Sequence, residues 1–119
     1  MKDENVITMK VNIRDEQIDC WLCGAFEGGS NYWCDGIRVK DNDYKGVKYA
    51  SDCVSKGGVL IVEMYDKKEI DKKCILNALE KMPSLNCSKA QKKLIDDSYD
   101  SGDCDILFQI AVFGDVIYG

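Results

Sequence analysis

The sequence contains no histidine among its 119 residues, and this absence narrows the chemistry that the chain can perform. Histidine is the commonest general base at neutral pH, because its ordinary pKa lies close to that pH. An enzyme built on this chain would have to use carboxylates, Lys, Tyr or Cys instead. A Walker-type loop, a Gly-x-Gly-x-x-Gly turn and a carboxylate pair spaced to share one apolar face are missing too. We therefore expect a protein that is not an enzyme and needs no cofactor.

Long apolar runs and a surplus of positive charge are also lacking. No segment approaches the roughly 18 apolar residues of a membrane span, and the first ten residues lack the apolar stretch of a signal peptide. The sequence therefore predicts a cytoplasmic protein without membrane contact. With 16 basic and 21 acidic residues the net charge is −5, which argues against direct nucleic-acid binding. An acidic surface favours solubility, and it can also meet a basic patch on another protein.

Seven cysteines are many for this length, and an odd number cannot all pair within one chain. Cys20 and Cys23, in CWLC, have the spacing of a metal knuckle or a redox pair. A structural zinc site needs four ligands, usually from two such pairs, and the sequence has no second CxxC. The pair also falls inside an expected helix, whereas a redox motif follows a strand and opens a helix. We expect reduced, mostly buried thiols and no metal site.

Two charged clusters invite other interpretations. The stretch 96–105 holds five aspartates and no base, but EF-hand positions six and twelve, counted from Asp96, fall on Ser101 and Leu107. Those positions require Gly and Glu, so we interpret the stretch as the acidic N-terminal end of a helix. The lysines of DKKEIDKK, residues 66–73, are diluted by acids and predict a solvated turn.

The apolar pattern predicts strands early in the chain and helices late. Strands are expected over residues 5–13, 32–40 and 59–65, and the last is apolar enough to be central in its sheet. The turn at 66–73 is the expected tip of a hairpin that returns Ile70 to the strand at 59–65. This order favours an α+β fold in a single domain, residues 1–119. Its small, mostly antiparallel sheet of about three strands packs with four or five short helices, and the C-terminal helix is buried.

The first expected helix has one apolar face. Its residues recur at three- and four-residue spacing: Ile18, Trp21, Leu22, Ala25 and Phe26. Gly28 and Gly29 are expected to end this helix through a left-handed C-cap.

Shorter helices are expected over 47–58, 74–82 and 88–100. Gly57 and Gly58 close the first of these, Pro83 ends the second, and Ser88 caps the third. The segment 106–113 is apolar almost all round, with one amide, which predicts a buried helix. Asp103 is its expected N-cap and Gly114 its C-cap, and a central strand is the alternative.

The stretch AFEGGSNYW, residues 25–33, places two glycines, a carboxylate and two large aromatics side by side. The glycines let the backbone turn, and Ser30 and Asn31 can bond neighbouring amides. Tyr32 and Trp33 bring large contact area at low entropy cost, as interface anchors do. Two interpretations stay open: the rings cap the core beneath the loop, or they form a recognition surface.

This stretch and the terminus FQIAVFGDVIYG together resemble a family of short proteins encoded by bacteriophages and prophages. The family's first block is similar to TAFEGGSNYW and its last to ADxxLQxAxFGEVVYG, with a strand and a helical middle between them. Cys34 stands where an aromatic is common, and Asp115 where glutamate is common. The matching positions are Glu27, Gly28, Gly29, Asn31, Tyr32 and Trp33 in the first block and Gln109, Phe113, Gly114 and Tyr118 in the second. The resemblance implies an accessory phage protein in the cytoplasm of the bacterial host.

One physical hypothesis links the two blocks. If the terminal helix is buried beside the first helix, Gln109 can satisfy polar groups of the loop at 27–31, because a buried amide needs partners. The blocks then form one structural unit with Trp33 and Tyr118 at its margin.

The leading functional hypothesis is a phage protein that acts by binding. Its expected partner is a host protein, a nucleic-acid-handling component of a defence system, which it would inhibit as an anti-CRISPR protein does. Exposed aromatics and acidic residues, including Asp96 and Asp97, would make the contact. One alternative is a protein that sequesters a nucleotide signal on the GGSN amides, with Arg38 as the nearest cation. The other is a component of the virion or of its assembly, and the oligomeric state is left open.

Overall fold

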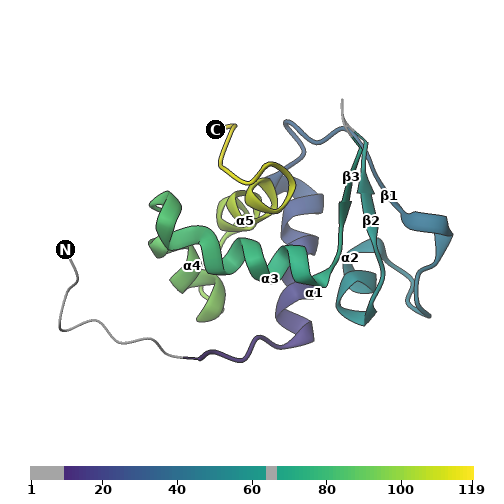
Figure 1. The fold of residues 1–119 in the computed structure, drawn as a ribbon, viewed down its shortest axis with the longest axis horizontal. Coiled ribbons are helices and arrows are strands. Elements are labelled where there is room, and N and C mark those ends of the chain that lie inside the picture. Colours follow the sequence, from purple (N-terminus) through teal and green to yellow (C-terminus); the bar gives the residue numbers. More distant parts are fainter. Residues whose placement is uncertain (1–9, 64–66) are drawn as a thin grey trace.

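A small antiparallel sheet and five α-helices make up the part of the chain that the computed structural model describes, residues 10–63 and 67–119. The strands are β1 (Ile37–Val39), β2 (Leu60–Val62) and β3 (Lys68–Ile70), in the order β1-β2-β3. The helices are α1 (Asp15–Gly24), α2 (Ala50–Cys53), α3 (Lys72–Lys81), α4 (Ser88–Ile95) and α5 (Ser101–Phe113). This arrangement confirms the expected α+β fold, and Figure 1 shows its elements. No helix in the described ranges has the length and apolar character needed to cross a membrane.

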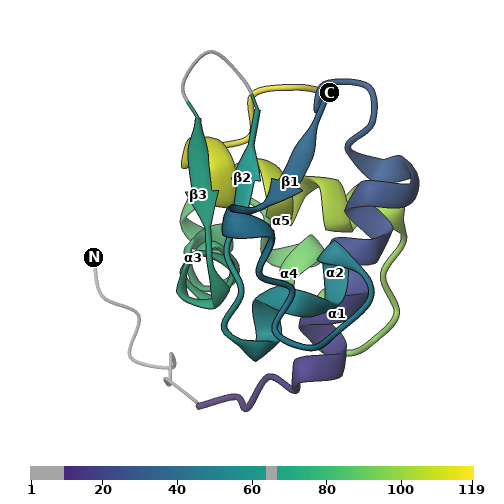
Figure 2. The same cartoon turned by 90° about the vertical axis from the view of Figure 1, so that its right-hand side faces the viewer.

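The sheet places one face against helices. Strand β2 is central and all three of its residues are buried, as its β-branched run predicts. Val39, Leu60 and Ile70 are paired across the sheet and buried together. Helices α3 and α5 contact β3 and lie behind the sheet in Figure 2. The expected hairpin is therefore confirmed, because β3 returns Ile70 antiparallel to β2. The expected turn at 66–73 is too long, because Lys68–Ile70 is strand β3 and α3 begins at Lys72.

Helix α5 forms the centre of the helical layer, where it packs against α1, α3 and α4 (Figure 1). Leu107, Phe108, Ile110 and Val112 are buried, while Ile106, Ala111 and Phe113 are partly buried, so the segment is a largely buried helix and not a strand. The sequence predicts Asp103 as its N-cap, but the N-cap is Asp100. The Asp100 carboxylate accepts from the amide of Asp103, whose own side chain accepts from the amide of Asp100. Gly114 is the C-cap in the left-handed conformation, as expected.

The two glycines after α1 act differently from the expectation. The helix continues as a π-helical turn, η1 (Ala25–Gly29), and neither Gly28 nor Gly29 is left-handed. A Cβ on Gly29 would lie 2.3 Å from the carbonyl oxygen of Ser101. Glycine is required there because the backbone of α5 approaches η1 too closely for any side chain.

Several expected boundaries are wrong. Residues 5–9 of the first expected strand lie outside the described ranges, and residues 10–13 form no strand. The expected strand 32–40 shrinks to β1, because a turn precedes it. Helix α4 stops at Ile95 because Asp97 adopts a left-handed conformation, with φ of 59°. Its N-cap is Cys87, so Ser88 is the first helical residue and not the cap.

The other short elements follow the sequence more closely. Helix α2 passes into a 3-10 turn, η3 (Val54–Lys56), which Gly57 ends in the left-handed conformation. Helix α3 is followed by another 3-10 turn, η4 (Met82–Leu85), with Pro83 in its first turn. The remaining 3-10 turn, η2 (Lys40–Asn42), follows β1.

Candidate functional site

Asp105 of α5 joins the two sequence blocks through a buried cluster of hydrogen bonds. Its carboxylate is 6% exposed. Oδ1 accepts from Ser30 Oγ at 2.8 Å and from Trp33 Nε1 at 2.6 Å. Oδ2 accepts from the hydroxyl of Tyr32 at 2.7 Å and from Gln109 Nε2 at 2.9 Å. One side chain of α5, three residues before the C-terminal block, therefore holds three side chains of the first block.

Four groups donate to the Asp105 carboxylate, two on each oxygen. An indole N–H and an amide N–H can only donate, and one of them lies on each carboxylate oxygen. All four groups that donate to Asp105 are neutral, so the negative charge is stabilised by dipoles and not by a paired cation.

Gln109 clamps the last residues of the chain onto the same cluster. Its side chain is fully buried, and its Oε1 accepts from the amides of Ile117 and Tyr118, both at 2.8 Å. Its Nε2 donates to the Tyr118 carbonyl at 3.2 Å and to the Tyr32 hydroxyl at 3.1 Å. Gln109 therefore links the two blocks, as the hypothesis requires, but it makes no hydrogen bond to the described loop residues 27–31. Its contact with the first block is Tyr32, while Ser30 is satisfied by Asp105 instead.

Trp33 belongs to the core of this unit. It is 6% exposed and lies parallel to Tyr118, with ring centroids 5.7 Å apart and an angle of 6° between the planes. Phe108 and Phe113 contact it as well, with centroids at 5.7 and 5.1 Å. A buried indole needs a hydrogen-bond acceptor, and Asp105 provides it. Of the two interpretations of Trp33, core packing is correct and the recognition surface is wrong.

Tyr32 has the opposite environment, because 58% of it is exposed although its hydroxyl is bonded to Asp105. The hydroxyl therefore points at the Asp105 carboxylate, while much of the residue stays in contact with solvent. The hydrogen bond to the Asp105 carboxylate raises the pKa of Tyr32 above its ordinary value. The ring of Tyr32 meets the ring of Tyr118 edge to face, with centroids 6.4 Å apart, and Tyr118 is 40% exposed. Ile117 precedes Tyr118 in the chain and is 58% exposed. We call Tyr32, Ile117 and Tyr118 the tyrosine patch.

The remaining candidate residues are divided between two places. Glu27, Gly28 and Asn31 are exposed in the first block, close in sequence to the tyrosine patch. Asp96 and Asp97 are exposed as well, but they lie at the opposite end of α1. Asp97 accepts there from Arg14 at 2.8 Å and from Gln17 at 3.3 Å. The structure therefore does not bring the two aspartates to the AFEGGSNYW block.

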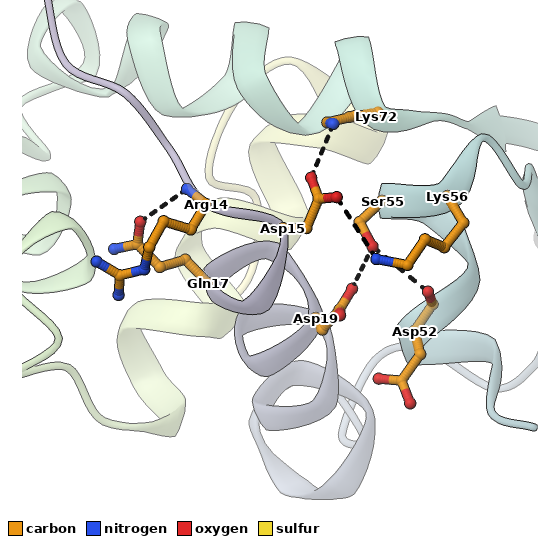
Figure 3. A network of polar contacts seen from close by, with 8 residues as sticks. All are labelled: Arg14, Asp15, Gln17, Asp19, Asp52, Ser55, Lys56 and Lys72. Carbon is orange, nitrogen blue, oxygen red and sulfur yellow. Dashed lines mark hydrogen bonds and ion pairs between the residues drawn. The ribbon is translucent and has the colours of Figure 1, made fainter. Parts of the chain in front are cut away.

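A separate set of polar contacts fixes this far end of α1, as Figure 3 shows. Asp15 accepts from Lys72 of α3 at 2.9 Å and pairs with Lys56 at 3.5 Å. The Lys72 contact lowers the pKa of Asp15. Asp19 accepts from Ser55 at 2.6 Å, and burial raises the pKa of this second carboxyl. These contacts attach α1 to α3 and to η3.

A hollow of about 270 Å³ lies beside the first block. It is the place where a nucleotide signal would bind if the protein sequestered one. It is lined by Ala25, Phe26, Ser30, Asn31, Cys34, Asp35, Gly36, Ile37 and Ala50. Its ionisable groups are the Asp35 carboxyl and the Cys34 thiol, whose pKa is raised by burial. Arg38, the cation considered for a phosphate, is bonded to Glu63. A phosphate in this hollow would therefore meet a carboxylate and no base.

All seven cysteines are free thiols. The expectation that most of them are buried is wrong, because only Cys53 and Cys104 are buried. Cys20 is exposed on α1, and the other four, Cys23, Cys34, Cys74 and Cys87, are partly exposed. Burial raises the pKa of Cys104 to about 12. Among the residues that the structure describes, no group of three or more possible ligands is placed to hold a metal ion.

Asp105 is the site residue that sequence reasoning missed, since it was counted only as part of the acidic stretch 96–105. A signal was present: Asp105 and Gln109 are four residues apart on an otherwise apolar helix, so they share one face. Two polar side chains on one buried face predict a shared hydrogen-bond network. No family model matches the chain, and neither a curated protein nor a solved structure was found to be similar to it.

Proposed function

We propose that this protein acts by binding another protein, with the tyrosine patch at the centre of the contact surface. The observation that carries the proposal is an uneven distribution of charge. The segments 25–37 and 94–119, which we call the two-block body, contain eight Asp and Glu and no Lys or Arg. Two of these acids, Asp103 and Asp105, are buried, and Asp96 and Asp97 lie at the far end of α1. The other exposed acids of the body are Glu27, Asp35, Asp100 and Asp115. The other 80 residues carry all 16 basic residues and 13 acidic ones. Exposed rings on an acidic body suit a partner with a basic surface.

The partner that we propose is a nucleic-acid-handling component of a bacterial defence system. Such proteins need basic surfaces to bind phosphates, and an acidic body can occupy those surfaces in place of nucleic acid. The resemblance of both blocks to short phage and prophage proteins supports the same assignment, with action in the cytoplasm of the host. The protein would then be a non-enzymatic inhibitor of host defence, comparable in role to an anti-CRISPR protein.

The two alternatives have less support. Sequestration of a nucleotide signal needs groups that bind phosphate, and the hollow beside the first block offers a carboxylate instead. For a virion component we find no specific observation.

An infection assay combined with affinity capture tests the proposal. Expression of the protein should restore phage plating on a strain whose defence system is active, and a tagged copy should retain the defence component from lysate. Tyr32→Ala should weaken both effects, whereas Tyr49→Ala should not. Tyr49 is a matched control because it is also 58% exposed and lies outside the two-block body. Trp33→Ala is unsuitable as a test, because Trp33 is buried.

Three results would contradict the proposal. Unchanged plating with no retained protein would remove the inhibitor role. A thermal shift with cyclic oligonucleotides would favour sequestration, and recovery of the protein in purified virus particles would favour a structural role.

A further inference from the structure

The two most exposed tyrosines of the described chain differ in their electrostatic environment. Tyr49 already lies under a cation, because Lys48 Nζ is 5.4 Å from the centroid of its ring. Tyr32 is equally exposed at 58%, but its block contains no Lys or Arg between residues 25 and 37. The same structure therefore shows one exposed tyrosine with a cation and one that offers its ring to a partner.

The surroundings of Tyr32 favour a positive group. The Asp105 carboxylate accepts from its hydroxyl, with Oδ2 at 2.7 Å, and all four groups that donate to this carboxylate are neutral. A phenol that donates to a carboxylate becomes richer in electrons, and its ring face attracts cations more strongly. Asp115, three residues before Tyr118, adds an exposed carboxylate in the same segment. Lys81 is the nearby base, and its Nζ donates to the Gly114 carbonyl at 2.6 Å as a cap of α5.

The patch is also held in place before any partner arrives. The Tyr32 hydroxyl is fixed by Asp105 and Gln109, while the Tyr118 ring is fixed by its parallel packing on Trp33. The backbone amides of Ile117 and Tyr118 are bonded to Gln109. A rigid, partly apolar surface over a buried negative charge fits a flat cation that is weakly hydrated. Guanidinium has these properties, whereas an ammonium group is compact and strongly hydrated.

We infer that the tyrosine patch receives an arginine side chain of the protein partner, stacked on the ring of Tyr32 and beside Tyr118. This inference rests on the proposed function and names the chemistry of its contact. The partner segment is basic, and its arginine both covers the exposed rings and approaches the carboxylates of the two-block body.

A titration of the full chain with defined peptides tests the inference. The probe is the capped peptide Gly-Arg-Gly-Arg-Gly, compared with its lysine and citrulline analogues, and binding is followed by amide chemical shifts at low ionic strength. Citrulline keeps the shape of arginine and removes its charge. We expect shifts at Tyr32, Ile117 and Tyr118, and an affinity for the arginine peptide at least about threefold above that for either analogue.

Variants separate the ring from general charge. Tyr32→Leu keeps apolar volume and removes the aromatic face, so it should weaken arginine binding about fivefold. Tyr49→Leu, the matched control, should leave the affinity within about twofold. Tyr32→Phe keeps the ring and loses the bond to Asp105, so its affinity should lie between wild type and Tyr32→Leu. Folding of each variant is checked by the amide spectrum before the titration, and Tyr118→Leu replaces a Tyr32 variant that does not fold.

The inference is overturned if citrulline and arginine peptides bind equally, if shifts fall outside the patch, or if loss of the ring has no effect. Its failure can be told from that of the proposed function. Capture of a defence component with no arginine binding at the patch would contradict the inference and leave the proposed function unaffected. Arginine binding at the patch with no captured protein and no effect on plating would contradict the proposed function and leave the inference unaffected.

Discussion

Replacing Asp105 by asparagine changes one atom at the centre of the two-block body and leaves the volume of the side chain almost unchanged. The carboxylate accepts hydrogen bonds on both oxygens, from Trp33 Nε1 on one and from Gln109 Nε2 on the other. Asparagine offers one acceptor oxygen and one amide that donates. Whichever way its side chain is turned, one of the two obligate donors faces an N–H group.

The expected loss of stability follows from these contacts. A buried donor without a partner costs about 1–3 kcal/mol, and the remaining hydrogen bonds weaken by up to half when the acceptor loses its charge. Neutralising a buried anion returns part of this free energy, because the carboxylate no longer has to be kept out of water. We therefore expect Asp105→Asn to lower the free energy of unfolding by about 2–3 kcal/mol. For a chain of this size that corresponds to a drop in Tm of roughly 8–12 °C.

Urea unfolding followed by circular dichroism, in the presence of a reductant, measures this effect. Asp96→Asn is the matched control, because it makes the same chemical change at an exposed aspartate, and it should stay within about 0.5 kcal/mol of wild type. A value for Asp105→Asn within 0.5 kcal/mol of wild type would refute the reasoning, since the carboxylate would then not be the group that holds the two blocks together.

Three further predictions concern packing, thiol exposure and pH. Gly29→Ala should destabilise the fold by more than Gly28→Ala in thermal melts, because a Cβ at 29 meets the backbone of α5 at 2.3 Å while a Cβ at 28 meets nothing within 4 Å; equal losses would contradict the close approach. A thiol reagent should modify Cys20 of the native protein well before Cys104, as read by mass spectrometry, and the reverse order would be inconsistent with their burial. Burial raises the pKa of Cys104 from 9.0, and that of Tyr99 from 10.0, to about 12 in both cases. Because the folded pKa values lie above the unfolded ones, the two groups contribute to the free energy of unfolding while they are protonated. This contribution is complete below pH 9 and is lost as the pH rises from 9 to 12. The urea midpoint should fall over that range, and less so above pH 10 in Tyr99→Phe.

The parts of the fold that the sequence predicts well are those with local signals. The run at 59–65 is β-branched and begins after two glycines, and it contains the central strand β2. The spacing of Ile18, Trp21 and Leu22 predicts α1 and its buried face, and Gly114 predicts the end of α5. These features depend on a few neighbouring residues, so the sequence carries them directly.

The candidate site depends on contacts between residues that are distant in the sequence. For this reason the sequence predicts the role of Gln109 but not that of Asp105. The resemblance and the need to satisfy a buried amide pointed to Gln109. Ser30 and Asp105 are 75 residues apart, and nothing in either segment alone shows that they meet. The same contact determines that Trp33 is buried while Tyr32 keeps its ring exposed. Local residue types could only leave both interpretations open.

The most direct test of the central claim, that the two blocks form one rigid body with the chain's last residues clamped onto it, is amide hydrogen exchange at Ile117 and Tyr118. Residues 115–119 have no helix or strand, yet both amides are bonded to the buried Gln109 side chain at 2.8 Å. Their exchange should be at least about 100-fold slower than in an unstructured peptide. Exchange of both amides at the unstructured rate would contradict the account, because the tyrosine patch would then have no fixed shape.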